Sequence, residues 1–127
     1  MEWVVIVTVL VLFQYVLFGV QVGGMRGKHE VKAPAMSGPP EFERMLRVHY
    51  NTMEQLVLIL PLMWMFAYWV KPVWAAGFGA LFIVARFIYR AAYLKDPKSR
   101  SLGFMLSFFP AAVMGIWLLV VAVRDLL

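Results

Sequence analysis

The sequence contains no cysteine, and only two of its 127 residues are histidine. Without thiols there is no disulfide framework, no thiolate metal site and no cysteine nucleophile, so any sulfur chemistry would need a sulfur atom supplied by a ligand. His49 has no second histidine, cysteine or carboxylate at ligand spacing, and we therefore predict no metal site. The chain also lacks a glycine-rich phosphate loop, a catalytic Ser/His/Asp set and a paired-carboxylate site.

Charged residues are scarce as well: 15% of the sequence is charged, whereas 63% is hydrophobic. The mean hydropathy is +0.78, well above the globular norm. A soluble helical bundle needs a charged face on every helix, but here the charges fall in a few clusters. The solvent for most of this surface must therefore be lipid. Nucleic-acid binding is not expected, because membrane topology explains the formal net charge of +5.

Four segments are long and apolar enough to cross a bilayer, which takes roughly 20 residues. We predict membrane-spanning helices over residues 2–24, 41–70, 73–95 and 100–124, with proline-containing turns at Lys71-Pro72 and Asp96-Pro97. A cleaved signal peptide is the alternative for the first segment, but its start lacks a positive n-region and its apolar run is too long. The sequence thus predicts an all-α, integral membrane four-helix bundle that forms one domain over residues 1–127.

The basic residues predict how this bundle is oriented. If successive loops lie on alternate sides, only Lys71 and Arg124 of the twelve lysines and arginines fall on one side, and ten fall at or near the other. The positive-inside rule then places loops 24–40 and 95–100 in the cytoplasm and both termini across the membrane. The last residues carry no eukaryotic retention signal, which is compatible with a bacterial inner membrane.

The second predicted helix carries a polar stripe. Its members recur at steps of three, four and three residues: Arg44, Arg47, Asn51 and Glu54. Such steps place side chains on one side of an α-helix. The rise from Arg47 to Glu54 is about 10 Å. Cations at one end and a carboxylate deeper along the helix suit a short, peptide-like zwitterion.

The third predicted helix repeats this arrangement with Arg86, Tyr89 and Tyr93. Charged residues this close to a membrane span are costly unless they face the bundle interior or reach the interface, so they are candidate functional residues. A structural alternative stays open at this stage: Glu54 would pair with Arg86 or Arg47, and the tyrosines would be interfacial anchors. The two interpretations differ in whether these side chains converge on a shared, water-accessible cavity.

The start of the second predicted helix resembles a known family signature. Residues 38–47, read as GPPEFERMLR and followed by Asn51 and Glu54, are similar to the second-helix motif of the MAPEG family, the membrane-associated proteins of eicosanoid and glutathione metabolism. Further similarities lie on the third helix and at the start of the fourth: Ala85-Arg86, Tyr89, Tyr93 and Arg100-Ser101. Length, four spans and the positions of the short turns agree over essentially the whole chain.

The resemblance implies a homotrimer that holds glutathione between neighbouring subunits near the cytoplasmic side, with an apolar electrophile entering from the bilayer. The resemblance also implies that Arg100 stabilises the glutathione thiolate and that Ser101 assists it. This role is physically reasonable, since a fixed cation favours a thiolate over a thiol. Arginine also binds carboxylates through two parallel N–H donors. The residues predicted to bind glutathione are Arg26, Arg47, His49, Asn51, Glu54, Arg86, Tyr89 and Tyr93.

Three positions depart from the eicosanoid-forming members of that family. Gly27 and Gln55 replace an arginine and a tyrosine of the leukotriene-forming member, and Phe104 replaces a tyrosine of the prostaglandin-forming member. The departures favour a general glutathione transferase resembling the microsomal members, which conjugates lipophilic electrophiles or reduces hydroperoxides. A non-enzymatic lipid-binding or scaffold member is the alternative. A small multidrug transporter also has four spans, but it depends on a carboxylate in the first helix, and residues 3–22 contain none.

Overall fold

The computed structural model covers residues 1–127 and consists of helices and their connections. In chain order the elements are α1 (Glu2–His29), α2 (Pro40–Trp69), α3 (Pro72–Lys95), the short 3-10 helix η1 (Pro97–Ser99) and α4 (Ser101–Leu126). By length and composition, four helices are able to cross a membrane. The predicted all-α fold with four membrane-spanning helices is confirmed.

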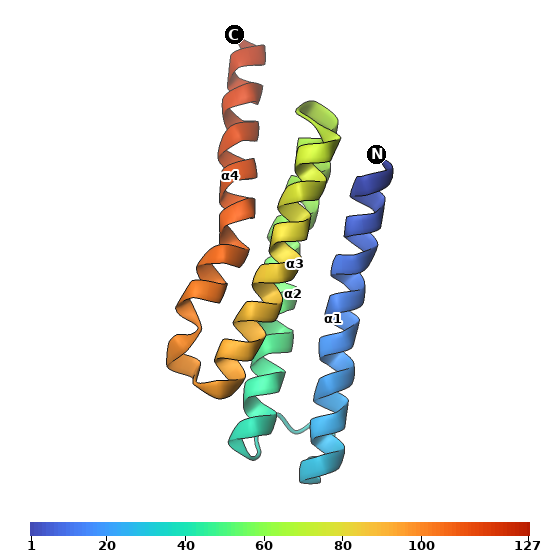
Figure 1. The fold of residues 1–127 in the computed structure, drawn as a ribbon, viewed down its shortest axis with the longest axis vertical. Helices are drawn as coiled ribbons and strands as arrows, with labels where there is room; N and C mark the ends of the chain where they lie inside the picture. Colours follow the sequence, from blue (N-terminus) through green and yellow to red (C-terminus); the bar gives the residue numbers. More distant parts are fainter.

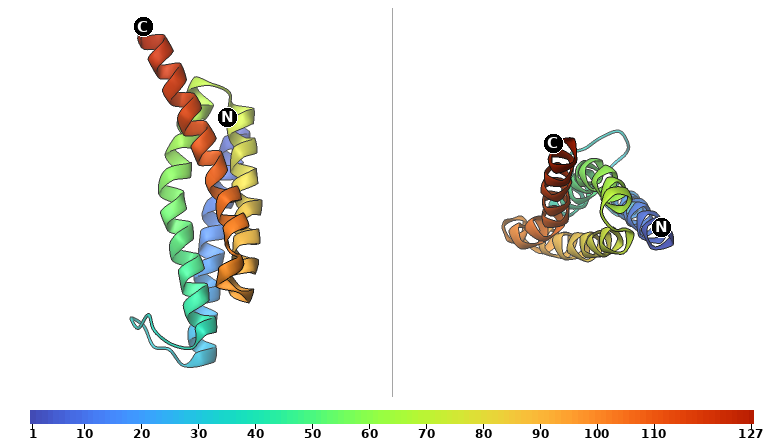
Figure 2. Two further views of the ribbon diagram at one scale, coloured as in Figure 1. Left: turned by 90° about the vertical axis from the view of Figure 1, so that its left-hand side faces the viewer. Right: turned by 90° about the horizontal axis from the view of Figure 1, so that it is seen from above.

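The helices alternate in direction along the bundle. Both termini and the α2–α3 connection lie at one end, and the other two connections lie at the opposite end (Figure 1). α1 and α4 lie on opposite sides of the bundle, and each packs against both α2 and α3. The C-terminal part of α4 diverges from the other helices and extends beyond them (Figure 2).

The first helix is longer than predicted. We expected it to end near residue 24, because glycines and charges follow, but α1 continues to His29. Glycine lowers helix stability by only about 1 kcal/mol per residue and does not forbid the helix. α1 ends where Glu30 takes the left-handed conformation with φ 55°, and the backbone N–H groups of Glu30 and Val31 donate to the Arg26 carbonyl.

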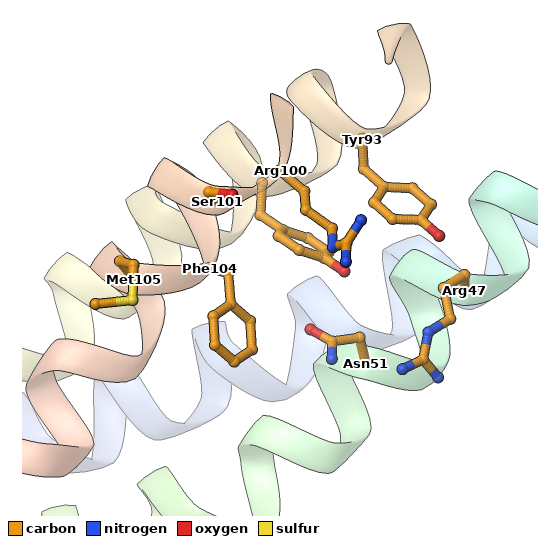
Figure 3. Close-up of a pocket in the computed structure, with 8 residues that line it drawn as sticks. Arg47, Asn51, Tyr93, Arg100, Ser101, Phe104 and Met105 are labelled. Carbon is orange, nitrogen blue, oxygen red and sulfur yellow. The ribbon is translucent and has the colours of Figure 1, made fainter. Parts of the chain in front are cut away.

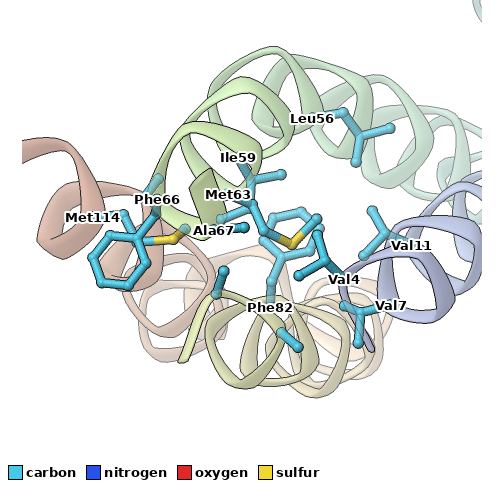
Figure 4. Packing of buried hydrophobic residues seen from close by; sticks show 13 residues of the cluster. Val4, Val7, Val11, Leu56, Ile59, Met63, Phe66, Ala67, Phe82 and Met114 are labelled. Atoms are coloured by element: carbon cyan, nitrogen blue, oxygen red, sulfur yellow. The ribbon is translucent and has the colours of Figure 1, made fainter. Parts of the chain in front are cut away.

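Apolar side chains form two packed clusters inside the bundle. The cluster nearer the termini joins all four helices around Met63, Phe66 and Phe82 (Figure 4). The cluster nearer the long loop joins α1, α2 and α3 around Phe18 and Phe42. Many large apolar side chains face outward along every helix, which suits a surface bathed in lipid.

Candidate functional site

A cavity of about 470 Å³ lies among α2, α3 and the start of α4. In Figure 3 several of its lining side chains point from these different helices into one common space. Its lining residues are Arg47, Asn51, Tyr89, Tyr93, Arg100, Ser101, Phe104 and Met105. The structure therefore brings together six of the ten side chains that the sequence singled out, from three separate segments.

The cavity is rich in hydrogen-bond donors and in positive charge. Arg47 and Arg100 supply two guanidinium groups, and no carboxylate lines the cavity. The only hydrogen bond of the Arg100 side chain runs from Nη1 to the Pro97 carbonyl at 3.0 Å, which leaves its other donors free. Such an arrangement can hold an anionic, hydrogen-bonding ligand, since arginine binds carboxylates with two parallel N–H donors.

One of the two ion pairs considered for Glu54 is present. Arg47 Nη1 and Glu54 Oε1 lie 3.3 Å apart, and both side chains are about half exposed. An exposed pair of this kind contributes at most about 1 kcal/mol to stability, so a ligand carboxylate can compete for Arg47. Arg47 still lines the cavity, whereas Glu54 does not. The pairing and the cavity therefore occur together, and neither interpretation excludes the other.

Arg86 lies behind the cavity wall instead of lining it. Its side chain is fully buried at 0% exposure. Nη2 donates to Asn51 Oδ1 at 2.9 Å and to Thr52 Oγ1 at 3.0 Å, and Nη1 donates to Ser107 Oγ at 3.1 Å. The guanidinium carbon also sits 4.1 Å from the centre of the Tyr89 ring. A side chain with no exposed surface has no direct contact with a ligand in this arrangement.

These contacts orient two residues of the cavity. Arginine carries only donors, so Asn51 must turn its oxygen toward Arg86. The amide nitrogen of Asn51 is then left free to donate elsewhere. The cation also packs on the Tyr89 ring, which holds that ring in place. Spacing alone grouped Arg86 with Tyr89 and Tyr93; the structure separates a buried supporting residue from two lining residues.

Close packing of α4 against α3 sets the position of Arg100. A Cβ atom added at Gly103 would lie 2.5 Å from Tyr89 Cα and 2.6 Å from the Tyr89 nitrogen. No side chain fits there, so only glycine lets the first turns of α4 approach the backbone of α3. Sequence reasoning missed Gly103, and its one signal was an isolated glycine in a helical segment.

Arg26 and His49 lie outside this cavity. Arg26 Nη1 donates to the Ala35 carbonyl at 2.7 Å, which ties the end of α1 to the following loop. His49 faces α1, where its ring stacks on Tyr15 with 4.4 Å between ring centres. A Cβ atom at Gly19 would lie 3.1 Å from His49 Nε2. Both side chains therefore belong to the side of the bundle formed by α1 and α2.

Two lining residues were not among the predicted ones. Phe104 and Met105 follow Arg100 and Ser101 by four residues, and this spacing places each pair on one side of α4. That spacing was visible in the sequence. Their apolar side chains give the cavity one hydrophobic flank beside its polar groups.

Comparison with known proteins gives a consistent result. The family model described as MAPEG family matches residues 4–120. The chain is 37% identical to microsomal glutathione S-transferase 2 of Mus musculus over 101 residues, which are 80% of this chain and 69% of that protein. It is 32% identical to leukotriene C4 synthase of Bos taurus over 114 residues, which are 90% of this chain and 73% of that protein. An uncharacterized protein of Synechocystis is 37% identical over 112 residues, 88% of this chain and 82% of that protein.

The family match covers all four helices, and the relatives align over most of both sequences. This chain is an integral, multi-pass membrane protein of four helices, and it belongs to the MAPEG family.

Proposed function

We propose that this protein is a membrane-bound glutathione S-transferase that conjugates glutathione with lipophilic electrophiles. The observation that carries the proposal is the cavity in which Arg47, Asn51, Tyr89, Tyr93 and Arg100 converge. Glutathione is a tripeptide with two carboxylates, one amine and one thiol, so it needs cations and donors together. Two relatives are named glutathione S-transferase and leukotriene C4 synthase, in agreement with this chemistry.

Each lining residue has a role in this proposal. Arg47 binds a glutathione carboxylate with two N–H donors. The free amide nitrogen of Asn51 and the tyrosine hydroxyls hydrogen-bond to the peptide groups of the ligand. Arg100 sits beside the thiol and lowers its pKa, because a nearby cation favours the charged form. Ser101, next to it at the start of α4, donates a second hydrogen bond to the thiolate.

The reaction needs no nucleophile from the protein. The thiol releases its proton to water, and the thiolate sulfur forms a bond to the electrophilic carbon while the leaving group departs with its electron pair. The protein contributes electrostatic stabilisation and brings a water-soluble thiol beside a membrane-dissolved partner. Phe104 and Met105 provide the apolar flank against which that partner lies.

We further propose that the active unit is a homotrimer, with glutathione bound between subunits. Arg26 and His49 lie on the α1–α2 side, away from the cavity of their own subunit. Packing that side against the open cavity of a neighbour would bring these side chains to the ligand, and the half-exposed Glu54 would face the same space. In the membrane, the α1–α2 and α3–α4 connections, at the end of the bundle that carries most of the basic residues, would lie in the cytoplasm, where glutathione is dissolved. A bacterial inner membrane fits this orientation.

The test is kinetic and uses one variant with one control. Purified protein is assayed with glutathione and 1-chloro-2,4-dinitrobenzene, with a lipid hydroperoxide as a second substrate. Arg100→Ala should lower kcat by about 100-fold, as loss of a donor to a developing or full negative charge typically does, and change glutathione affinity far less. Lys98→Ala removes an exposed cation two residues away and should leave both unchanged.

Two results would contradict the proposal. Wild-type turnover in Arg100→Ala would remove Arg100 from the mechanism. Absence of turnover with either substrate in the wild-type protein, together with absence of saturable glutathione binding, would instead support a non-enzymatic lipid-binding or scaffold protein.

A further inference from the structure

An apolar groove runs along the outer side of the bundle, between the parallel helices α1 and α3. Two hollows of about 360 Å³ and 350 Å³ lie in this groove and share Leu10. The hollow nearer the cytoplasmic ends of the helices is lined mainly by Phe13, Leu17, Ile83 and Phe87. None of these side chains lines the candidate active site, which opens on the other side of α3.

The groove is apolar and long enough to hold a lipid acyl chain. The hollows span α3 from Val73 to Phe87, and fourteen residues of α-helix rise about 21 Å. Each leaflet contributes about half of a hydrocarbon core of roughly 30 Å, so the groove is longer than one leaflet is thick. A Cβ atom at Gly77 would meet nothing within 4 Å, which shows open space at the far end. The groove can therefore accept an extended acyl chain.

A cation stands at the cytoplasmic end of this groove. Arg90 follows Ile83 and Phe87 at steps of seven and three residues, which continues their stripe on α3. Its Nε donates to Gln21 Oε1 of α1 at 2.7 Å, so Arg90 and Gln21 bridge the two helices just below the apolar hollow. Arg90 lies five residues before the end of α3 at Lys95, a rise of about 7.5 Å, which is the depth of a membrane interface.

Arg90 has no acidic partner. Its one hydrogen-bond partner, Gln21, is uncharged, and Arg90 takes part in no ion pair. Both of its terminal nitrogens, with four N–H donors, have no partner in the protein, and neither has the amide nitrogen of Gln21. Arginine near hydrocarbon needs a counter-charge, and its planar fork matches the oxygens of a phosphate.

From this combination we infer a binding site for an anionic phospholipid on the outer side of α1 and α3. The phosphate binds Arg90 and the Gln21 amide, and one acyl chain lies in the groove past Leu17 and Phe87 toward Leu10. The site is independent of the proposed glutathione chemistry. It is also free in the proposed trimer, which uses the α1–α2 side and the open cavity as its contact surfaces.

The test is native mass spectrometry of the full-length protein in detergent with equimolar phosphatidylglycerol and phosphatidylcholine of matched acyl chains. The wild-type protein should retain phosphatidylglycerol about fivefold better, the preference expected from one arginine at a membrane surface. Arg90→Gln should lose this preference. Lys98→Gln removes an exposed cation at the same end of the bundle and should keep it.

Two further variants separate the lipid site from a structural role. Arg90→Lys keeps the charge but not the bond from Nε to Gln21, so it should retain part of the preference. Leu17→Trp fills the hollow next to Arg90 without a change in charge and should lower retention of both lipids. If Arg90→Gln does not fold, these two variants carry the test on their own.

Three outcomes would overturn the inference. The first is that the wild-type protein shows no preference for phosphatidylglycerol. The second is that Arg90→Lys loses the preference as completely as Arg90→Gln does. The second result would mean that Arg90 only ties α3 to α1. Alternatively, Leu17→Trp would change the mass of the assembly in the same spectra, which would mean that a second copy of the chain covers the groove.

Discussion

Gly103→Ala is a small change with a large expected effect on the candidate site. The added methyl carbon would lie 2.5 Å from Tyr89 Cα, whereas carbon atoms pack best at roughly 3.5–4.0 Å. The atoms it meets first are backbone, so no side-chain rotation relieves the contact. The start of α4 must therefore move away from α3 by about 1 Å, and Arg100, Ser101 and Phe104 must move with it.

The stability effect and the activity effect of this change differ in size. Overpacking costs about 1–3 kcal/mol. Replacing glycine by alanine inside a helix returns about 1 kcal/mol. The net loss of stability should thus be at most about 2 kcal/mol, whereas a displacement of about 1 Å at a reacting centre can lower turnover by about 100-fold.

Glutathione conjugation and thermal unfolding, measured on the same preparations, check this prediction. Gly115→Ala on the same helix is the matched control, because its new methyl would meet the Leu62 methyls at 3.7 Å, which is ordinary contact. The control should keep full activity and unfold at the same or a slightly higher temperature. Wild-type kcat/KM in Gly103→Ala would refute the argument that close packing at Tyr89 places Arg100.

Two further predictions concern buried positions. Arg86→Met keeps side-chain bulk but removes the donor that fixes the orientation of the Asn51 amide. Asn51 then no longer holds its nitrogen ready to donate to the ligand, and the loss of that bond from a buried site costs about 1–3 kcal/mol, so calorimetry should show glutathione binding weakened by about tenfold. Unchanged affinity would show that Asn51 does not depend on Arg86. Gly79→Ala on α3 would place a methyl against Val7 of α1 and 2.7 Å from Met63 Sδ of α2. The melting temperature should therefore fall, with little change in KM. An unchanged melting temperature would contradict the close packing of α1 and α2 against α3 at this point.

The sequence alone predicted the fold well because the bilayer imposes simple requirements. Twenty or so apolar residues, interrupted by prolines and charges, are enough to locate a membrane span. The end of α1 was the exception. The helix runs on to His29 because Glu30 terminates it in a left-handed conformation, and a glutamate in that conformation carries no recognisable pattern.

The candidate site was only partly predictable, because residue spacing reports the face of a helix and not its depth. Arg86 and Tyr89 share a face and are both buried, yet only Tyr89 lines the cavity, and Arg86 supports it from behind. The contact between Gly103 and Tyr89 joins two helices, and nothing in either segment alone indicates it. Phe104 was noticed as a departure from related proteins, but its place in the wall depends on how α4 crosses α3.

The central claim is that glutathione binds in the cavity among α2, α3 and α4. Isothermal titration calorimetry of the purified protein with glutathione tests it most directly, with Arg47→Ala as the site variant and Arg124→Ala, at the opposite end of the bundle, as the control. We expect saturable binding that Arg47→Ala weakens by about tenfold or more, as loss of a charge-assisted hydrogen bond does, and that Arg124→Ala leaves unchanged. Equal affinity in all three proteins, or no saturable binding in any, would contradict it.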